Sequence, residues 1–265
     1  MKTMDPIGPA FSAILDQPVE NQLIFFYPIF MGTAGRKLDI RDLTPLAGVV
    51  GSGVLLLGWI ITGVAYRGRA GELFSPLNHF ISELGQTGVS RLSTLFNLCM
   101  IAGGLLLIVF MLALGLYIDK ISGYIACAVG ILAAISAILV GFFPINHGSV
   151  HKTVSIFFFW GALVAIIIFN LTIATDSKRR ISRWLVVPGF ISFALFTLLI
   201  LALRASPTPT AVLDPGLAVR PTVWMIAILE WLAVLSLIAC VLSFSLYMYR
   251  ARSAAYRVPS NVVNR

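Results

Sequence analysis

The sequence predicts an all-α membrane protein: a polytopic bundle of six transmembrane helices, with a short amphipathic interfacial helix between the first and the second. Of the 265 residues, 58% are hydrophobic and only 11% are charged, whereas soluble domains carry about 25% charged residues. So few charged side chains cannot cover the surface of a soluble protein of this size. The apolar stretches are continuous and do not alternate with polar residues, which predicts helices and not a β-barrel.

Six apolar stretches are long enough to cross a hydrocarbon core about 30 Å thick, which needs about 20 helical residues. They cover residues 45–66, 92–118, 121–143, 153–174, 184–203 and 222–249. We therefore expect a transmembrane domain over residues 44–250, between an N-terminal cytoplasmic or interfacial segment (1–43) and a basic cytoplasmic tail (251–265). Within the N-terminal segment, the apolar run 23–32 contains Pro28 and is too short to span, so it is predicted to lie at the membrane surface or re-enter it.

The first connection contains the residues that predict the interfacial helix, 76–84. Ser75 is a favourable N-cap, Pro76 suits the first helical position, and Gly85 suits the C-terminal end. The apolar residues follow the spacing of one helical face; they are Leu77, Phe80, Ile81 and Leu84. The opposite face then collects Asn78, His79, Ser82 and Glu83. We expect this helix to lie on the outer interface or to dip into it.

The distribution of basic residues predicts the orientation. With the N-terminus in the cytoplasm, thirteen of the 19 Lys and Arg residues fall on the cytoplasmic side and six on the other. This asymmetry predicts a multi-pass protein of the cell (inner or plasma) membrane with both termini in the cytoplasm. The net charge of +8 is spread over the connections instead of forming one patch, so we expect membrane lipids and no nucleic acid as partners.

The outward connections collect unusual polar residues. All three histidines of the chain lie there, His79 in the first connection and His147 and His151 in the second, beside Asn146. Asn97 lies in the outward half of the second helix. Glu230 lies in the last helix, roughly 13 Å below a start near Pro221 at 1.5 Å per residue. A charge at such depth is costly, so we expect Glu230 to face the bundle interior, toward the second and fourth helices, and either to find a partner or to be protonated. The candidate polar site is therefore Asn78, His79, Ser82, Glu83, Asn97, Asn146, His147, His151 and Glu230.

Each candidate also has a structural interpretation. Glu83 can pair with an arginine such as Arg91 or cap a helix, and Glu230 can be a hydrogen-bonding anchor between helices. A metal held by His79, His147 and His151 with a glutamate meets the usual ligand number, although the spacing is not that of a recognised zinc site. Two stripes of small residues in the third helix indicate either internal packing or a homo-oligomer face; they are Ser122, Ala126, Gly130 and Ala134, and Ala133, Ala137 and Gly141.

Several short motifs resemble those of a known family. The segment Pro-Leu-Asn-His-Phe-Ile-Ser-Glu-Leu-Gly (76–85), Leu-Phe-Asn-Leu (95–98) with Gly103-Gly104, and Gly-Phe-Phe-Pro (141–144) followed by His151 and a Phe-rich helix are similar to the prokaryotic membrane family DUF998. A more distant similarity is to the Frag1/DRAM/Sfk1 group, where an Asp is common at the position of Glu83. The resemblance covers most of residues 45–250. It implies the fold but no activity, because the family is uncharacterised; the distant group includes proteins connected with membrane lipids.

Three classes of function remain open. The first and favoured one is a non-catalytic membrane protein whose outward polar cluster binds a lipid headgroup, an ion or a partner protein. The second is an intramembrane hydrolase or lipid-modifying enzyme that uses His and Glu as acid–base groups, with or without a metal. The third is a transporter or channel, although the sequence shows no inverted repeat and no pair of broken helices. No cofactor can be named, because the sequence carries no phosphate-binding loop, dinucleotide fingerprint or haem-attachment motif.

Overall fold

The computed structural model describes residues 43–177, 181–206 and 220–256, with side chains as far as residue 251. The described part of the chain contains six helices long and apolar enough to cross a membrane, which confirms the six-helix prediction. They are α3 (Leu43–Ala65), α4 (Ser93–Ile118), α5 (Ile121–Phe142), α6 (Ser149–Ala174), α7 (Val186–Ala205) and α9 (Met225–Tyr256). The apolar run 23–32 and most of the C-terminal tail lie outside the described residues; helix α9 itself continues to Tyr256, beyond its predicted end.

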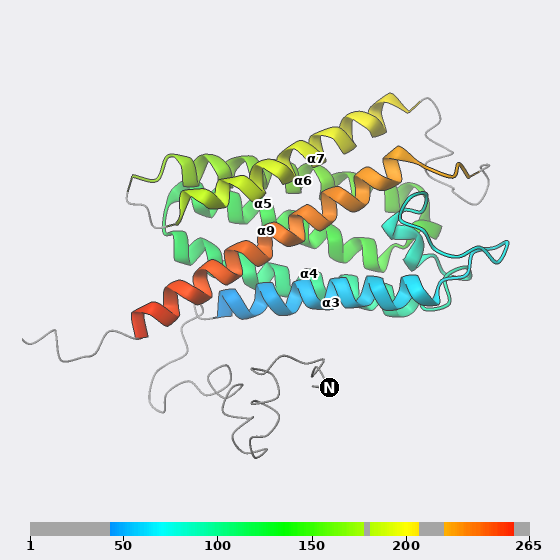
Figure 1. The fold of residues 1–265 in the computed structure, drawn as a ribbon, viewed down its shortest axis with the longest axis horizontal. Coiled ribbons are helices and arrows are strands. Elements are labelled where there is room, and N and C mark those ends of the chain that lie inside the picture. The colour runs from blue at the N-terminus through cyan, green and yellow to red at the C-terminus, as the bar shows by residue number, and fades with distance from the viewer. Residues whose placement is uncertain (1–42, 178–180, 207–219, 257–265) are drawn as a thin grey trace, which may run out of the picture. The chain divides into compact units, whose positions relative to one another are not determined.

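Each long helix packs against the next one along the chain, and α9 packs against both α7 and α3 (Figure 1). Large apolar side chains remain on the outer surface of these helices; Leu57, Val64 and Phe190 are each more than half exposed. Such a surface is stable in contact with lipid tails but not with water. The interior contains aromatic and aliphatic clusters, one of them around Trp59, Tyr66 and Phe96. The chain is therefore an integral, multi-pass membrane protein.

The small-residue stripes of the third predicted helix lie inside the bundle. In α5, Ala126, Gly130, Ala133, Ala134, Ala137 and Gly141 are all buried. A Cβ atom added to Gly130 would lie 2.8 Å from Met111 of α4, and one added to Gly161 of α6 would lie 3.1 Å from Ala133. Small residues at four-residue spacing let helix backbones approach closely. The stripes thus pack α5 against its two neighbours within one chain.

The prediction of an interfacial α-helix over residues 76–84 is wrong. The structure has a turn after Ser75 and then only a five-residue 3₁₀ helix, η2 (Ile81–Gly85). One helical turn does begin, because the His79 backbone N–H donates to the Ser75 carbonyl. It stops because tertiary partners take the next backbone groups: the Trp224 N–H donates to the Leu77 carbonyl at 2.7 Å, and the Ile81 N–H donates to Glu230 at 2.9 Å. The segment is folded into the end of the bundle instead of lying on its surface.

Candidate functional site

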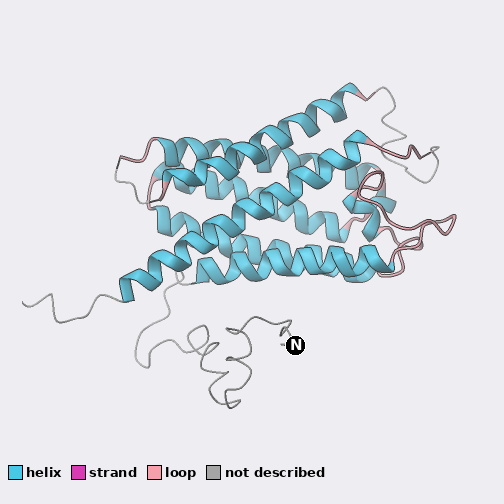
Figure 2. Ribbon diagram, in the orientation of Figure 1, coloured by secondary structure: helices cyan, strands magenta, loops and turns pink. Residues whose placement is uncertain are grey.

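The connections that were predicted to share one side of the membrane do meet at one end of the bundle, drawn at the right in Figure 2. Asn146 donates from its side chain to the Thr87 carbonyl at 3.0 Å and accepts from the Thr87 N–H at 2.8 Å. This pair joins the first connection to the second. Residues 220–224, which precede α9, lie along the first connection through the Trp224–Leu77 hydrogen bond. We call this end of the bundle the connection end.

The strongest polar contact at the connection end is an ion pair between Arg220 and Glu83. The two guanidinium nitrogens donate to the two carboxylate oxygens at 2.7 Å and 3.1 Å, and one of them also donates to the Asn78 carbonyl at 2.5 Å. The Glu83 side chain is only 1% exposed, and it also accepts the Phe80 N–H at 2.8 Å. We call this arrangement the Arg220–Glu83 clasp. The partner is therefore Arg220 and not Arg91, while the expected capping contact is also present.

The electrostatics of the clasp favour its charged form. Burial alone would lower the pKa of Arg220, but the hydrogen bonds and the negative charge of Glu83 outweigh burial and raise that pKa. Two parallel N–H···O bonds between a guanidinium and a carboxylate fix the orientation of both groups. The clasp thus attaches the segment before α9 to the segment between α3 and α4, which are 137 residues apart in the chain.

His79 is buried beside the clasp. Its ring packs against Tyr66 and Phe74, at centroid distances of 5.4 Å and 5.1 Å. Its Nδ1 lies 2.8 Å from the Asn78 side-chain oxygen and 3.2 Å from the Ser75 carbonyl. The Ser75 N–H also points at Nδ1, at 3.3 Å, so Nδ1 has partners of both kinds, whereas Nε2 has no hydrogen-bond partner among the described residues. Burial is the main cause that lowers the pKa of His79, which keeps the ring neutral.

This histidine predicts a pH dependence of stability. Since its pKa is lowered in the folded state, the unfolded chain takes up a proton first as the pH falls below about 6.5. The stability contribution of neutral His79 is therefore complete above that pH and is lost as the pH falls toward the folded-state pKa. We expect the Tm in detergent to fall between pH 7 and pH 5, and the fall to be smaller in His79→Gln. An equal fall in both proteins would show that other groups cause the pH dependence.

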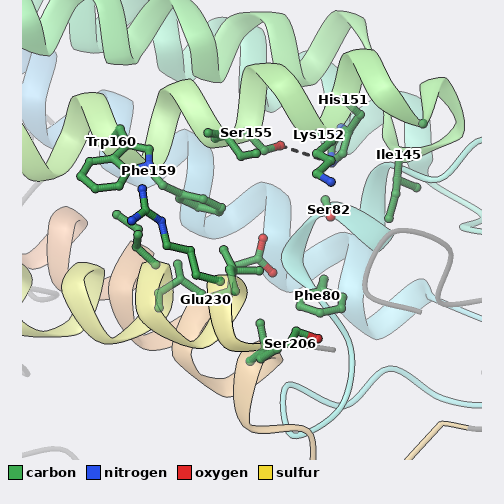
Figure 3. Close-up of a pocket in the computed structure, with 17 residues that line it drawn as sticks. Phe80, Ser82, Ile145, His151, Lys152, Ser155, Phe159, Trp160, Ser206 and Glu230 are labelled. Carbon is green, nitrogen blue, oxygen red and sulfur yellow. Dashed lines mark hydrogen bonds between the residues drawn. The ribbon is translucent and has the colours of Figure 1, made fainter. Parts of the chain in front are cut away.

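A cavity of about 350 Å³ opens beside the clasp, between α6, α7, α9 and the turn that precedes η2 (Figure 3). One face of α6 forms its longest wall; this α6 wall consists of Lys152, Ser155, Ile156, Phe159 and Trp160. Leu199, Leu203 and Arg204 line it from α7, and Ile226 and Glu230 line it from α9. The Arg204 guanidinium lies over the Trp160 ring, 5.1 Å from its centroid. The cavity is mainly apolar, with cationic groups on the α6 and α7 side.

Glu230 lines this cavity together with residues of α6, the fourth transmembrane helix, toward which it was predicted to face. A smaller cavity of about 70 Å³ places it beside Phe96 and Met100 of the second transmembrane helix, α4. The predicted depth is wrong: α9 begins at Met225 and not near Pro221, so Glu230 lies about 8 Å into the helix at 1.5 Å per residue. One carboxylate oxygen accepts the Ile81 N–H, which connects Glu230 to the first connection.

His151 and Ser155 lie one helical turn apart at the same cavity. His151 Nδ1 lies 2.8 Å from the Phe143 carbonyl, which can only accept, so the Nδ1 atom carries the proton. The Nε2 atom is then an acceptor, and it lies 3.4 Å from the Ser155 hydroxyl oxygen, as the dashed line in Figure 3 shows. His151 is 7% exposed. His151 and Ser155 thus place a base next to a hydroxyl group. Their contact is long, as catalytic hydrogen bonds often are in a site without its ligand.

The structure does not bring the predicted polar site together at one place. Asn78 and Glu83 belong to the clasp, with His79 packed beside it, and Ser82, His151 and Glu230 line the cavity. Asn97 and Asn146 join segments, Asn97 by donating to the Gly85 carbonyl at 3.2 Å, and His147 is exposed against Phe143. His79, His147 and His151 do not form a metal site, and no other group of three His, Cys, Asp or Glu side chains in the described ranges is arranged to hold one.

Sequence reasoning missed Arg220, Lys152 and Arg204. All three entered only the charge count, among the six basic residues on the outer side. Yet one helical face with i, i+3, i+4, i+7, i+8 spacing can be read from the sequence; it consists of Lys152, Ser155, Ile156, Phe159 and Trp160. That spacing was a signal for the cavity wall. Arg204 carried no such signal, because its role depends on how α7 packs against α6.

Comparison with known proteins supports the family assignment that the motifs suggested. No curated protein and no solved structure matches the chain. One family model does match, over residues 49–247. This range includes α4, α5, α6 and α7 entirely, the clasp and every residue of the cavity wall. The chain therefore belongs to the family described as "Protein of unknown function (DUF998)".

Proposed function

We propose that this protein binds an amphiphile with a phosphate-bearing headgroup, a membrane lipid, in the cavity between α6, α7 and α9. In this proposal the protein lies in the cell membrane with both termini in the cytoplasm, as the basic residues favour, and the cavity opens toward the outer side. The observation that carries the proposal is the combination of an apolar, aromatic cavity with two cationic side chains, Lys152 and Arg204, in one membrane protein.

The charges of the cavity favour an anionic group. Among the residues that the structure describes, no carboxylate lies within ion-pair distance of Lys152 or Arg204. Unpaired cations near a membrane interface attract phosphate, and ammonium and guanidinium groups are the usual protein donors to it. The apolar part of the wall, Ile156, Phe159 and Leu203, suits the first methylene groups of an acyl chain. A volume of about 350 Å³ lies within the range of small-molecule sites.

The test is lipid binding by the purified full-length protein. We expect native mass spectrometry in detergent to show bound phospholipid, and the double variant Lys152→Ala/Arg204→Ala to bind it at least about tenfold more weakly, since charge-assisted hydrogen bonds are lost. Arg91→Ala is the matched control, because Arg91 is exposed at the same end but does not line the cavity. Unchanged binding in the double variant, or no bound lipid at all in the wild-type protein, would overturn the proposal.

Hydrolysis of the bound lipid is the second candidate function, and His151 with Ser155 is the observation that favours it. In this mechanism the Ser155 hydroxyl oxygen attacks an ester carbonyl carbon, and the His151 Nε2 atom accepts the hydroxyl proton. His151 then passes this proton to the leaving alcohol. Water finally hydrolyses the acyl–serine ester and releases the acyl group. The same mass spectra decide between binding and hydrolysis. Lysolipid and free fatty acid that form with the wild type and not with Ser155→Ala indicate hydrolysis, whereas intact lipid in both indicates binding alone.

A further inference from the structure

Glu230 is a carboxylate inside an apolar helix without a cationic partner in the described ranges. One of its oxygens accepts the Ile81 N–H at 2.9 Å, and no ion pair joins it to Lys152 or Arg204 across the cavity. Arg220 cannot serve, because Glu83 occupies its guanidinium nitrogens. A charged side chain in a membrane helix is costly and marks a ligand or ion site unless it is paired. The missing partner is therefore expected to come from outside the protein.

The orientation of the carboxylate supports this expectation. Figure 3 shows Glu230 pointing into the cavity, across from Ser155 and Lys152 on the α6 wall. The Ile81 N–H determines where the carboxylate lies, and Ile81 itself is buried, 5% exposed, in a segment that the clasp attaches to the bundle. The acidic group is thus preorganised before any ligand enters, with Phe80 and Phe159 among the residues that line the same cavity.

The cavity therefore combines a cationic side, on α6 and α7, with an acidic side, on α9. A simple anion satisfies Lys152 and Arg204 but is repelled by Glu230, and a simple cation has the opposite difficulty. A metal ion is a poor fit, because no three ligand side chains converge among the described residues. A zwitterion satisfies both sides, and aromatic rings near an ammonium group add cation–π attraction.

We infer that the ligand is a zwitterionic aminoalkyl phosphate headgroup, whose phosphate binds at Lys152 and Arg204 and whose ammonium binds at Glu230. This inference rests on the proposed function and names the class of lipid. In such a headgroup two methylene groups separate the charges, so one molecule carries a charged group for each side of the cavity. The Ser155 hydroxyl and the Glu230 carboxylate are acceptors for ammonium N–H donors. A phospholipid with an uncharged polyol headgroup lacks the second contact.

The experiment compares phosphatidylethanolamine, phosphatidylcholine and phosphatidylglycerol with identical acyl chains, bound to the full-length protein in detergent and quantified by native mass spectrometry. We expect the wild-type protein to prefer phosphatidylethanolamine over phosphatidylglycerol by about tenfold, the value of one charge-assisted contact. Glu230→Gln is expected to remove this preference while binding of phosphatidylglycerol is retained. Glu72→Gln is the matched control, because Glu72 bonds locally to the Ala70 N–H and does not line the cavity.

The outcomes separate this inference from the proposed function. Lipid binding with an unchanged preference in Glu230→Gln overturns the inference alone, and absence of lipid from the wild type overturns the proposed function. Phosphatidylcholine can also be preferred over phosphatidylglycerol. If this preference equals that for phosphatidylethanolamine and depends on Glu230, it supports recognition of the ammonium charge. Competition by soluble glycerophosphoethanolamine distinguishes a lipid from a free headgroup. If this compound displaces the bound phospholipid only weakly, the ligand is a lipid. If it competes as strongly as the lipid itself, the headgroup chemistry is supported and lipid binding is overturned. If Glu230→Gln does not fold, Glu230→Asp, which withdraws the carboxylate by one methylene, must reduce the same preference.

Discussion

Replacing Arg220 with alanine is expected to lower the free energy of unfolding by about 3 kcal/mol, because the change leaves the Glu83 carboxylate buried without its counter-ion. Glu83 is only 1% exposed, whereas the Arg220 side chain is 18% exposed. Removing the acidic partner should therefore cost less, since a partly exposed guanidinium can still reach water. The free energy of unfolding is measured at pH 7 by adding increasing amounts of a denaturing detergent and following the loss of helix by circular dichroism.

The double variant Arg220→Ala/Glu83→Gln tests the cause of this loss. It leaves no unpaired buried charge at the clasp, so it is expected to be more stable than Arg220→Ala alone. Arg91→Ala, at an exposed position of the same end, should be close to wild type. If Arg220→Ala lost no more stability than Arg91→Ala, the clasp would not be a stabilising contact.

Gly141→Ala is expected to lower the free energy of unfolding by about 1–3 kcal/mol, the usual cost of overpacking a tightly packed interior. A Cβ atom at Gly141 would lie 2.7 Å from the Asn97 carbonyl oxygen and 2.9 Å from Ile101. The first of these atoms belongs to the backbone of α4, so the two helices must move apart to accept the methyl group. The same denaturation series measures the change.

Gly53→Ala is the matched control. No atom of the described residues lies within 4 Å of a Cβ atom added at Gly53, and alanine is the better helix former by about 1 kcal/mol in soluble helices. We therefore expect Gly53→Ala to be neutral or slightly stabilising. Equal effects of the two substitutions would mean that helix propensity, and not the close approach of α4 and α5, explains the loss at Gly141.

In the proposed function, ligand binding at the connection end depends on both the clasp and the cavity. The clasp connects the segment 75–83 to the segment before α9, and the Ile81 N–H of the first segment holds the Glu230 carboxylate. A variant that opens the clasp is therefore expected to weaken ligand binding indirectly, in addition to its effect on stability. The cavity variants Lys152→Ala and Arg204→Ala change the binding contacts directly and leave the clasp intact.

The sequence by itself determined the six membrane-spanning helices, because continuous apolar stretches of this length have few alternatives in a bilayer. It also determined that Glu230 must face the interior, since a lipid-facing carboxylate is too costly at that depth. Only the tertiary structure decided that residues 76–80 leave the helical path, because Trp224 and Glu230 take backbone partners that a helix would use internally. It also decided that Arg220 pairs with Glu83 and that Lys152, Arg204 and Glu230 share a cavity. The physical reason is that periodicity reports the environment of each helix face, whereas the partner of a polar group depends on contacts between segments far apart in the chain.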